Sequence, residues 1–353
     1  MSSSPPQSLV DIARRTESHL SAFLAVEEAR WSGFDTDLAS PVAEIRRLVA
    51  SGGKRLRPAF CHWGFVGAGG DPDSQVSLDT GAALELLHAF ALFHDDIMDG
   101  SLTRRGAAVT HEVFADQHRL TGGSGEARRY GEGIAILVGD LVHVYADQLL
   151  QGSPHAAWQV WNEMRIELNV GQYLDMLGSA TSERSRAKAE RVCRYKSAKY
   201  TIERPLHLGA VLANPDRATD LMTAFSAYGL PLGDAFQMRD DVLGAFGGTA
   251  ITGKPVGDDL REGKPTPLMA IATARANAAQ LKELQLVGNQ DLTTEQIARV
   301  QEVIRETGAL DELETVITRL TDEAIAAVQH VPFAQSVRDE LITLAEYVSW
   351  RTV

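Results

Sequence analysis

The feature that most constrains the fold is the spacing of apolar residues, which recur every three or four positions along almost the whole chain. This spacing places them on one face of an α-helix, whereas few segments alternate with the period of two that a strand needs. We therefore predict an all-α fold. The predicted helices cover residues 8–31, 41–50, 57–67, 79–99, 132–151, 155–178, 186–213, 216–245, 267–285, 294–307, 310–329 and 334–350.

The punctuation between these segments is consistent with helices. Pro58 suits a first helical turn, and Thr293 with Gln296 fits a capping box before an apolar run. The breaks fall at residues 51–53, 67–72, 121–133 (expected to be flexible) and 247–267, and none resembles a long linker. Because no period of 20–50 residues repeats either, we expect a single domain over residues 1–353. It would comprise an N-terminal helical region (1–40), a motif-bearing core (41–270) and C-terminal helices (271–353).

The formal net charge of −13 limits the partners of the chain. Nucleic acids and anionic membranes require a basic surface, so neither is expected. A polyanionic small substrate also looks disfavoured on net charge alone. Only two cysteines are present, and the N-terminus lacks the pattern of a secretory signal. Residues 82–93 form the longest apolar run, which is too short to span a bilayer, and we expect a cytoplasmic protein.

The most informative string is HAFALFHDDIMD at residues 88–99. Asp95 and Asp99 are four residues apart, so on a helix their carboxylates share a face about 6 Å apart along the axis. His88 lies two turns earlier on the same face. A solvated helix end is one interpretation. The acids close a strongly apolar helix, however, where unpaired carboxylates are costly and Mg²⁺ is a suitable partner. Arg104 and Arg105 follow at once and can bind an anion.

A second acidic string, QMRDD at residues 237–241, ends another apolar helix. Gln237 lies four residues before Asp241, so the amide and a carboxylate share a face. The loop that follows, with Lys254 and Lys264 among glycines, can hold a polyphosphate on cations and backbone N–H groups. Such a loop is also often a plain solvated turn.

Three further segments carry candidate polar groups. GGKRLRP at residues 52–58 places Lys54 and Arg57 at the start of a helix, where an anion is favoured, although a solvated charged turn is equally compatible. Lys196 and Ser197 stand in mid-helix, where a surface lysine is the ordinary explanation. Gln172 and Asp175 share a helical face and could form a buried polar pair.

Together these strings suggest a cavity with metal on both walls and cations at its rim, which fits a diphosphate ester. Mg²⁺ with Lys and Arg stabilises charge on a leaving diphosphate. No nucleophile with a histidine partner, P-loop or dinucleotide fingerprint is apparent in the sequence. The expected chemistry is ionisation of a C–O bond between apolar walls that exclude water.

Taken in order, GGKRLRP, LLHAFALFHDDIMD with RRG, GQYLD, YKSAKYT, FQMRDDVLG and GKPVGDDLREGKPT resemble the motifs of the trans-isoprenyl diphosphate synthases, most closely a geranylgeranyl diphosphate synthase. The resemblance extends from residue 52 to about residue 268. It implies the isoprenoid synthase fold, a single helical bundle around a central cavity, and a homodimer. It also implies Mg²⁺-dependent head-to-tail condensation of isopentenyl diphosphate with an allylic diphosphate, with three Mg²⁺ ions in each site.

The resemblance also assigns residues to roles. Asp95 and Asp99 would ligate Mg²⁺ with support from Asp96, and Asp240 would hold a third ion with Asp241 nearby. The isopentenyl diphosphate would be bound by Lys54, Arg57, His88 and Arg105. The allylic diphosphate would be bound by Arg104, Lys196, Gln237 and Lys254. Among the other substrate-binding residues, Ser197 would keep a hydroxyl where the family often has Thr, and Lys264 would help to close the site. Asp95, Asp99, Arg104, Lys196 and Asp240 would be the catalytic residues.

One position departs from the family pattern. The second acidic motif of the family usually has another acid where this chain has Gly244. Metal binding there is then weaker, or it draws on Asp241 or on the pair Asp258 and Asp259.

Product length is predicted from the residues before Asp95. Phe90 and Ala91 lie five and four positions upstream, about 6–8 Å deeper at the rise of a helix. In the family, one aromatic residue at the deeper place resembles C20 synthases, so we expect geranylgeranyl diphosphate, with farnesyl diphosphate next. Phe90 as an ordinary core residue is the alternative. Two other activities stay open: a synthase-like terpene cyclase, and a non-catalytic partner subunit of a prenyl synthase.

Overall fold

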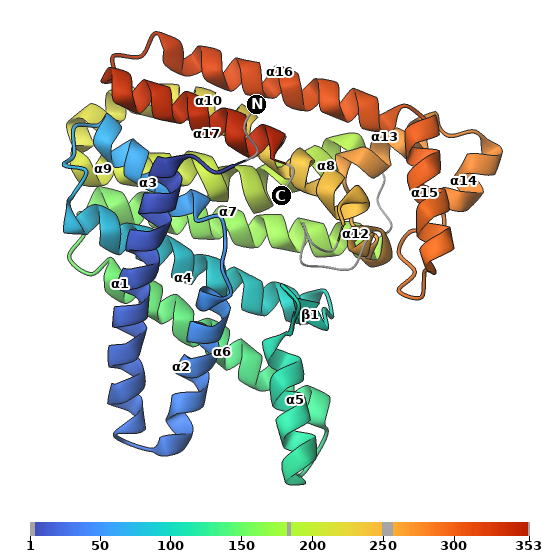
Figure 1. Cartoon of the computed structure of the whole chain (residues 1–353), viewed down its shortest axis with the longest axis horizontal. Helices are drawn as coiled ribbons and strands as arrows, with labels where there is room; N and C mark the ends of the chain where they lie inside the picture. Colours follow the sequence, from blue (N-terminus) through green and yellow to red (C-terminus); the bar gives the residue numbers. More distant parts are fainter. Residues whose placement is uncertain (1–3, 182–184, 249–256, 352–353) are drawn as a thin grey trace. The chain divides into compact units, whose positions relative to one another are not determined.

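The computed structural model describes residues 4–181, 185–248 and 257–351, and helices dominate it (Figure 1). The chain groups into two compact units. The N-terminal unit comprises Gln7–His62 and Asp71–Pro154. The C-terminal unit comprises residues 4–6, Trp63–Gly70 and the described chain from His155 onwards. The predicted all-α class is confirmed. A single domain over residues 1–353 stays a prediction.

The N-terminal unit is built around one apolar helix, α4 (Gln75–Met98), which packs against α1, α2 and α6. Its leucines at positions 84, 86 and 87 are fully buried, because this helix is apolar around most of its circumference. The other helical elements of the unit are α1 (Gln7–Ser32), η1 (Thr36–Leu38), α2 (Ala39–Ala50), the first part of α3 (Leu56–Gly67), α5 (Thr110–Thr121) and α6 (Ala127–Leu149).

By length and composition alone, α4 could cross a membrane, with a mean hydropathy of 1.3 in its most apolar window. However, 61% of that window is buried in the structure, as in the core helix of a globular protein. The apolar composition of α4 is therefore weak evidence for a membrane span.

Two elements of this unit were not expected from the sequence. A short antiparallel hairpin pairs β1 (Thr103–Arg104) with β2 (Ala107–Ala108), and α5 follows it. Arg105 and Gly106 form its two-residue turn with φ angles of 52° and 76°, as a type I′ turn requires. The prediction of a flexible stretch over residues 121–133 was wrong in its second half, because α6 begins at Ala127.

The C-terminal unit packs α10 (Pro215–Phe246) against α16 (Ala309–Gln329) and against the π-helix η2 (Cys193–Glu203). The capping box at Thr293 and Gln296 is confirmed, since each side chain bonds the backbone N–H of the other. The remaining helices of the unit are α7 (His155–Ala180), α8 (Arg186–Val192), α9 (Arg204–Ala213), α12 (Asp258–Glu262), α13 (Pro267–Arg275), α14 (Ala278–Leu284), α15 (Thr294–Glu306) and α17 (Gln335–Trp350).

The segment predicted as one helix over residues 186–213 is interrupted by η2. Long π-helices are rare and are found mostly at functional sites. Glycines let the neighbouring helices approach η2 closely: a Cβ atom on Gly171 of α7 would lie 2.3 Å from the amide nitrogen of Lys196, and one on Gly233 of α10 would lie 2.5 Å from Cα of Ala198. The backbone of η2 is thus fixed by contact with α7 and α10.

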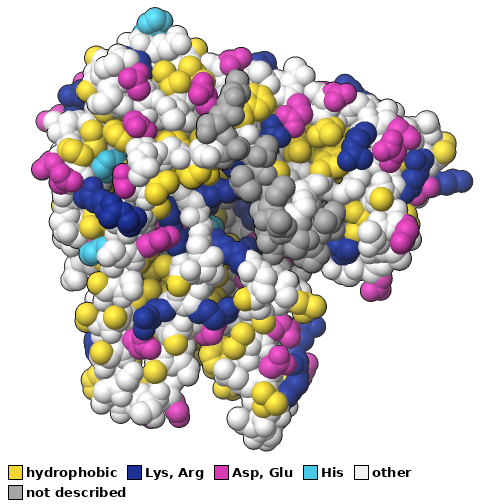
Figure 2. Space-filling view, viewed as in Figure 1, with side chains coloured by type: hydrophobic (Ala, Val, Ile, Leu, Met, Phe, Trp, Pro, Cys, Tyr) yellow, Lys and Arg dark blue, Asp and Glu magenta, His cyan; other side chains and the backbone are white. Residues whose placement is uncertain are grey.

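Acidic and basic side chains are interspersed over the described surface of the face drawn in Figure 2.

Candidate active site

The first acidic cluster lies at the C-terminal end of α4. Asp95 and Asp96 are in its last turn, and Asp99 is the C-cap, whose N–H donates to the carbonyl of Asp95 at 2.8 Å. Asp96 is buried, whereas Asp95 and Asp99 are partly exposed. The carboxylates of Asp95 and Asp99 are therefore partly open to solvent, whereas Asp96 is turned inward.

Arg104, on strand β1, holds this cluster together. Its Nε and Nη2 donate to Oδ1 of Asp96 at 2.8 and 2.6 Å, and its Nη2 lies 3.7 Å from Oδ2 of Asp95. Burial works to lower the pKa of Arg104, but the carboxylates of Asp96, Asp95 and Asp99 raise it above its usual value. Arg104 thus stays a cation at the edge of the acidic cluster.

A basic cluster surrounds His88 within the same unit. Burial, with the charges of Arg57, Arg105, Arg104 and Arg55, lowers the pKa of His88 well below its ordinary value. Burial and its arginine neighbours also lower the pKa of Arg105. Cations crowded in this way around a neutral imidazole favour a bound anion, which relieves their mutual repulsion.

The turn that carries Lys54 and Arg57 is organised by Arg55. Its buried guanidinium donates to Glu85 at 2.6 Å, to Glu17 at 3.1 Å and to the carbonyl of Val49 at 2.6 Å. Its backbone is left-handed, with φ of 49°, which is a costly conformation for a side chain of this size. Lys54, on the same turn, is exposed.

The contacts of Arg55 were not predicted from the sequence. The available signal was Glu85, an acid inside an apolar helix, because a buried carboxylate requires a cationic partner. Arg105 bonds to the same turn through Oγ of Ser51 at 3.0 Å and through the carbonyl of Gly52.

Lys196 and Ser197 lie on η2 in the C-terminal unit. Nζ of Lys196 donates to Oδ2 of Asp175 on α7 at 2.5 Å, and Asp175 is buried. Asp175, which was predicted to share a helical face with Gln172, therefore forms its ion pair with Lys196. Ser197 is half-buried beside Lys196.

The second acidic cluster lies near the C-terminal end of α10. Nε2 of Gln237 donates to Oδ1 of Asp241 at 2.8 Å, which confirms that the two side chains share a helical face. Asp241 is 5% exposed, and among the described residues its Oδ2 has no hydrogen-bond partner. Burial and the charges of Asp259 and Asp240 raise the pKa of Asp241 well above its ordinary range, against the effect of Gln237.

Asp240 is held by Arg351, which was not among the predicted site residues. The guanidinium of Arg351, just after α17, pairs with Oδ1 of Asp240, donates to the carbonyl of Val348 at 2.8 Å and stacks 4.2 Å from the ring centroid of Phe236. Arg351 is 1% exposed. Its position near the chain end gave no spacing from which the contact could be predicted.

Of the two lysines predicted in the following loop, the structure describes Lys264. Nζ of Lys264 lies 2.5 Å from Glu262 and 3.6 Å from Oδ1 of Asp259. Lys254 lies outside the described residues.

Phe90 and Ala91 lie on α4 beside α6. The ring of Phe90 stacks on His143 with centroids 4.5 Å apart and contacts His94 with centroids 4.6 Å apart. Gly139 makes room for His94, since a Cβ there would lie 2.3 Å from the imidazole. The predicted chain-length residue is thus one ring of a three-ring cluster.

The oxygen donors at the two acidic clusters fit Mg²⁺. In the described part of the chain, no three acidic, histidine or cysteine side chains already converge as a metal cage. Mg²⁺ is usually bound by one or two carboxylates together with phosphate oxygens of the substrate. The partly exposed pair Asp95 and Asp99 matches that kind of site, and so does Oδ2 of Asp241, which has no hydrogen-bond partner among the described residues.

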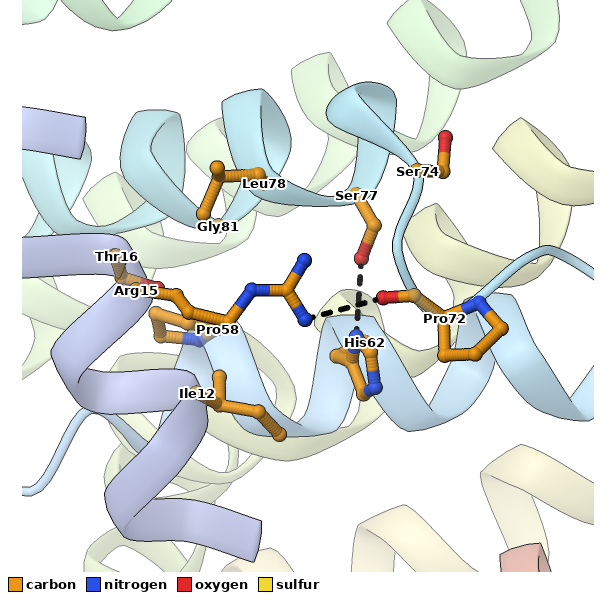
Figure 3. A pocket seen from close by; sticks show the side chains of 10 residues that line it. All are labelled: Ile12, Arg15, Thr16, Pro58, His62, Pro72, Ser74, Ser77, Leu78 and Gly81. Atoms are coloured by element: carbon orange, nitrogen blue, oxygen red, sulfur yellow. Dashed lines mark hydrogen bonds between the residues drawn. The ribbon is translucent and has the colours of Figure 1, made fainter. Parts of the chain in front are cut away.

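Two cavities in the N-terminal unit do not involve the predicted residues. One, between α1, α3 and α4, has a volume of about 20 Å³ and contains the Arg15 bond to the carbonyl of Pro72 and the His62 bond to Ser77 (Figure 3). This volume suffices for a single water molecule. The other, about 480 Å³, lies between α1 and α2 and is lined by groups such as Leu24 and Arg46.

Comparison with known proteins gives concordant matches. The family model for polyprenyl synthetase matches residues 42–307. The chain is 32% identical over 306 residues to a geranylfarnesyl diphosphate synthase of Aeropyrum pernix, covering 84% of this chain and 89% of that protein. It is 32% identical over 316 residues to a geranylgeranyl diphosphate synthase of Mycobacterium tuberculosis, covering 88% and 83%.

Among solved structures, a geranylgeranyl pyrophosphate synthase from Corynebacterium glutamicum, complexed with isoprenyl diphosphate and magnesium, matches with a TM-score of 0.90. It is 38% identical, and the match covers 96% of this chain and 98% of that one.

The helical architecture with its acidic and basic clusters defines an enzyme of the isoprenoid synthase fold. The chain belongs to the polyprenyl synthetase family and is a prenyltransferase of the isoprenyl diphosphate synthase class. The predicted fold and family are therefore confirmed.

Proposed function

We propose that this enzyme condenses isopentenyl diphosphate head-to-tail with an allylic diphosphate to make a short-chain all-trans prenyl diphosphate. The observation that carries the proposal is the arginine cluster around a neutral His88, which lies in the same unit as the acidic end of α4. Such a unit offers one place for an anion and another for a metal-bound anion. The Corynebacterium relative was crystallised with isoprenyl diphosphate and magnesium, the ligands that these two places suit.

The basic cluster would bind isopentenyl diphosphate. Arg57 and Arg105 supply charge, and exposed Lys54 adds a third cation from the turn that Arg55 fixes. His88, neutral at physiological pH because its pKa is lowered, can hydrogen-bond a phosphate oxygen without adding a charge that would have to be neutralised.

Magnesium would be held by Asp95 and Asp99 on one cluster and by Asp240 and Asp241 on the other, with three ions in each site. Asp96 would act through Arg104, which it holds beside Asp95. When bound, Mg²⁺ would neutralise the charge that develops on the leaving diphosphate. Asp240 has to leave Arg351 for this role, and the exposed position of its carboxylate allows that movement.

The allylic diphosphate would contact the remaining polar residues. As its C–O bond breaks, the bonding pair leaves with the diphosphate, and the cations hold that charge in place. The double bond of isopentenyl diphosphate then attacks the carbocation, and a proton is lost to restore an alkene. The residues assigned here are Arg104, Lys196, Ser197, Gln237, Lys254 and Lys264.

The product is proposed to be geranylgeranyl diphosphate, with farnesyl diphosphate as the next candidate. Phe90, which stacks on His143 and contacts His94, would form a floor, and small Ala91 would leave room above it. Relatives of similar sequence identity are named for products of different chain length, so sequence identity does not distinguish these products. The proposal therefore rests on the rings around Phe90.

A homodimer is proposed from exposed apolar faces. Ile166, Val170, Tyr173 and Leu177 follow helical spacing along α7 and are each at least 45% exposed. A solvent-facing apolar stripe of this kind is typical of a protein interface. We also propose a cytoplasmic location and a single functional domain over residues 1–353.

Purified protein incubated with Mg²⁺, isopentenyl diphosphate and C5, C10 or C15 allylic diphosphates tests the proposal, with products analysed by mass spectrometry. Elongated diphosphates up to C20 are expected. Cyclic hydrocarbons would instead support a terpene cyclase, and absence of turnover would support a non-catalytic partner subunit.

A further inference from the structure

A cavity of about 480 Å³ lies between α1 and α2 in the N-terminal unit, and none of its lining residues is among the predicted site residues. The two helices pack against each other and are joined through η1 (Figure 1). The volume falls within the range of roughly 300–1,000 Å³ that is usual for small-molecule sites. The cavity is therefore large enough for an organic ligand, whose chemistry follows from the lining.

One part of the lining is apolar or small. Leu24 on α1 and Val49 on α2 are buried. Ser21, Ala43 and Ala50 line the cavity at exposed positions, so that longer side chains there would occupy part of its space. An apolar tail that replaces water over these residues is favoured by the hydrophobic effect.

The charged part of the lining is mainly cationic. Arg46 and Arg47 are neighbours on α2, and the acid that lines the cavity is Glu17 on α1. The charge of Glu17 is already compensated, because its Oε1 accepts from Nε of Arg55 at 3.1 Å. The lining thus has an excess of positive charge in a chain whose formal net charge is −13. This local charge is complementary to an anion.

Both arginines keep N–H groups for a ligand. Nη1 of Arg46 pairs with Glu28, whereas its Nε and Nη2 bond no other described residue. Arg47 donates from Nε and Nη2 to Glu44 at 3.0 and 2.8 Å, and its Nη1 likewise bonds no described residue. The edge of Arg46 that carries Nε and Nη2 matches the two oxygens of a carboxylate or a phosphate.

We propose that the cavity between α1 and α2 binds a single-chain anionic amphiphile, which is a carboxylate or phosphate head on one apolar tail. The head would accept hydrogen bonds from Arg46 and Arg47, and the tail would lie over Leu24 and Val49. The site uses none of the residues assigned to the diphosphate substrates. The inference therefore does not depend on the proposed reaction.

Isothermal titration calorimetry with decanoate and with decyl phosphate, each below its critical micelle concentration, tests the site. Both should bind saturably with one molecule per chain, and the tighter of the two identifies the head that the arginines prefer. Saturating inorganic pyrophosphate should displace neither, because the residues assigned to diphosphate lie outside the cavity lining. Decyltrimethylammonium, which has the same tail and a cationic head, should show no measurable binding.

Variants with matched controls locate the bound molecule. Arg46→Gln should weaken decanoate binding roughly 10-fold, because a charge-assisted contact is lost. Arg14→Gln, at an exposed arginine of α1 outside the lining, is its control. Ala43→Phe should abolish binding by filling the cavity, and Ala29→Phe, at an exposed position of α1 outside the lining, controls for the added ring. Since all four positions are exposed, the variants should fold, which circular dichroism verifies.

Absence of saturable binding, equal binding of decyltrimethylammonium, or wild-type affinity in Arg46→Gln and Ala43→Phe would overturn the inference. Displacement by pyrophosphate would also overturn it, because the amphiphile would then lie at the diphosphate site. If Ala43→Phe changes the oligomeric state in analytical ultracentrifugation while Ala29→Phe does not, a second copy of the chain covers the cavity and the amphiphile site is refuted.

Discussion

Gly171 provides the sharpest stability prediction, because α7 and η2 meet there backbone to backbone. In Gly171→Ala, the new methyl carbon would lie 2.3 Å from the amide nitrogen of Lys196 and 2.6 Å from its Cα. Ordinary contacts begin at 3.4 Å, so the two elements must separate by roughly 1 Å. On its other side η2 abuts Gly233, where a Cβ would lie 2.5 Å from Ala198, and the movement has no free space.

Overpacking of a core costs about 1–3 kcal/mol, and we expect about 3 kcal/mol here because the opposing atoms are backbone. Separation of the elements also lengthens the 2.5 Å bond from Lys196 to Asp175. The KM for the allylic diphosphate should therefore rise along with the loss of stability.

Urea unfolding followed by helical circular dichroism measures the effect. Gly133→Ala on α6 is the matched control, because a Cβ there meets no atom within 4 Å. Alanine in a helix should stabilise that variant by roughly 0.5–1 kcal/mol, which is the opposite sign. If Gly171→Ala is as stable as wild type or as Gly133→Ala, the backbone contact between α7 and η2 is not as described.

Three further predictions follow. Burial and the charge of Arg15 lower the pKa of His62 from 6.5 to about 4. As pH falls through this window, the unfolded chain binds a proton at His62 that the folded chain does not, and the free energy of unfolding decreases. In His62→Gln, urea unfolding between pH 6 and pH 4.5 should show a loss of unfolding free energy that is smaller by roughly 1.4 kcal/mol per pH unit. Arg55→Met leaves its buried glutamate partner without a cation and should cost roughly 3–5 kcal/mol in urea unfolding. Phe90→Ala should lengthen the prenyl product and Ala91→Phe should shorten it, by mass spectrometry, and unchanged products in both would remove them as chain-length residues.

Much of the fold could be predicted from the sequence because local spacing determines it. The apolar periodicity predicted most helices, and the pair Thr293 and Gln296 predicted a helix start to the residue. Helix α5 was missed because only a few of its twelve residues are apolar, so its pattern is weak. The π-helix was missed because no local spacing indicates it, and the glycines that lie close to it, Gly171 and Gly233, are distant in sequence.

The candidate site divides in the same way. Contacts within one helix, such as Gln237 with Asp241, follow from a spacing of four residues. Contacts between elements cannot be predicted from such a spacing. Examples are the ion pair of Arg351 with Asp240 and the close approach of Asp259 to Gly244. One sequence feature did indicate a contact between elements. Glu85 is an acid within an apolar helix and therefore needs a cationic partner, which is Arg55.

The central claim is that the acidic end of α4 holds the metal that drives prenyl transfer. The most direct measurement compares wild type with Asp95→Asn for incorporation of labelled isopentenyl diphosphate, across a Mg²⁺ titration and with folding verified by circular dichroism. We predict Mg²⁺-dependent elongation in the wild-type enzyme and no measurable turnover in a folded Asp95→Asn variant at any Mg²⁺ concentration. A folded variant that elongates at the wild-type rate would contradict the claim.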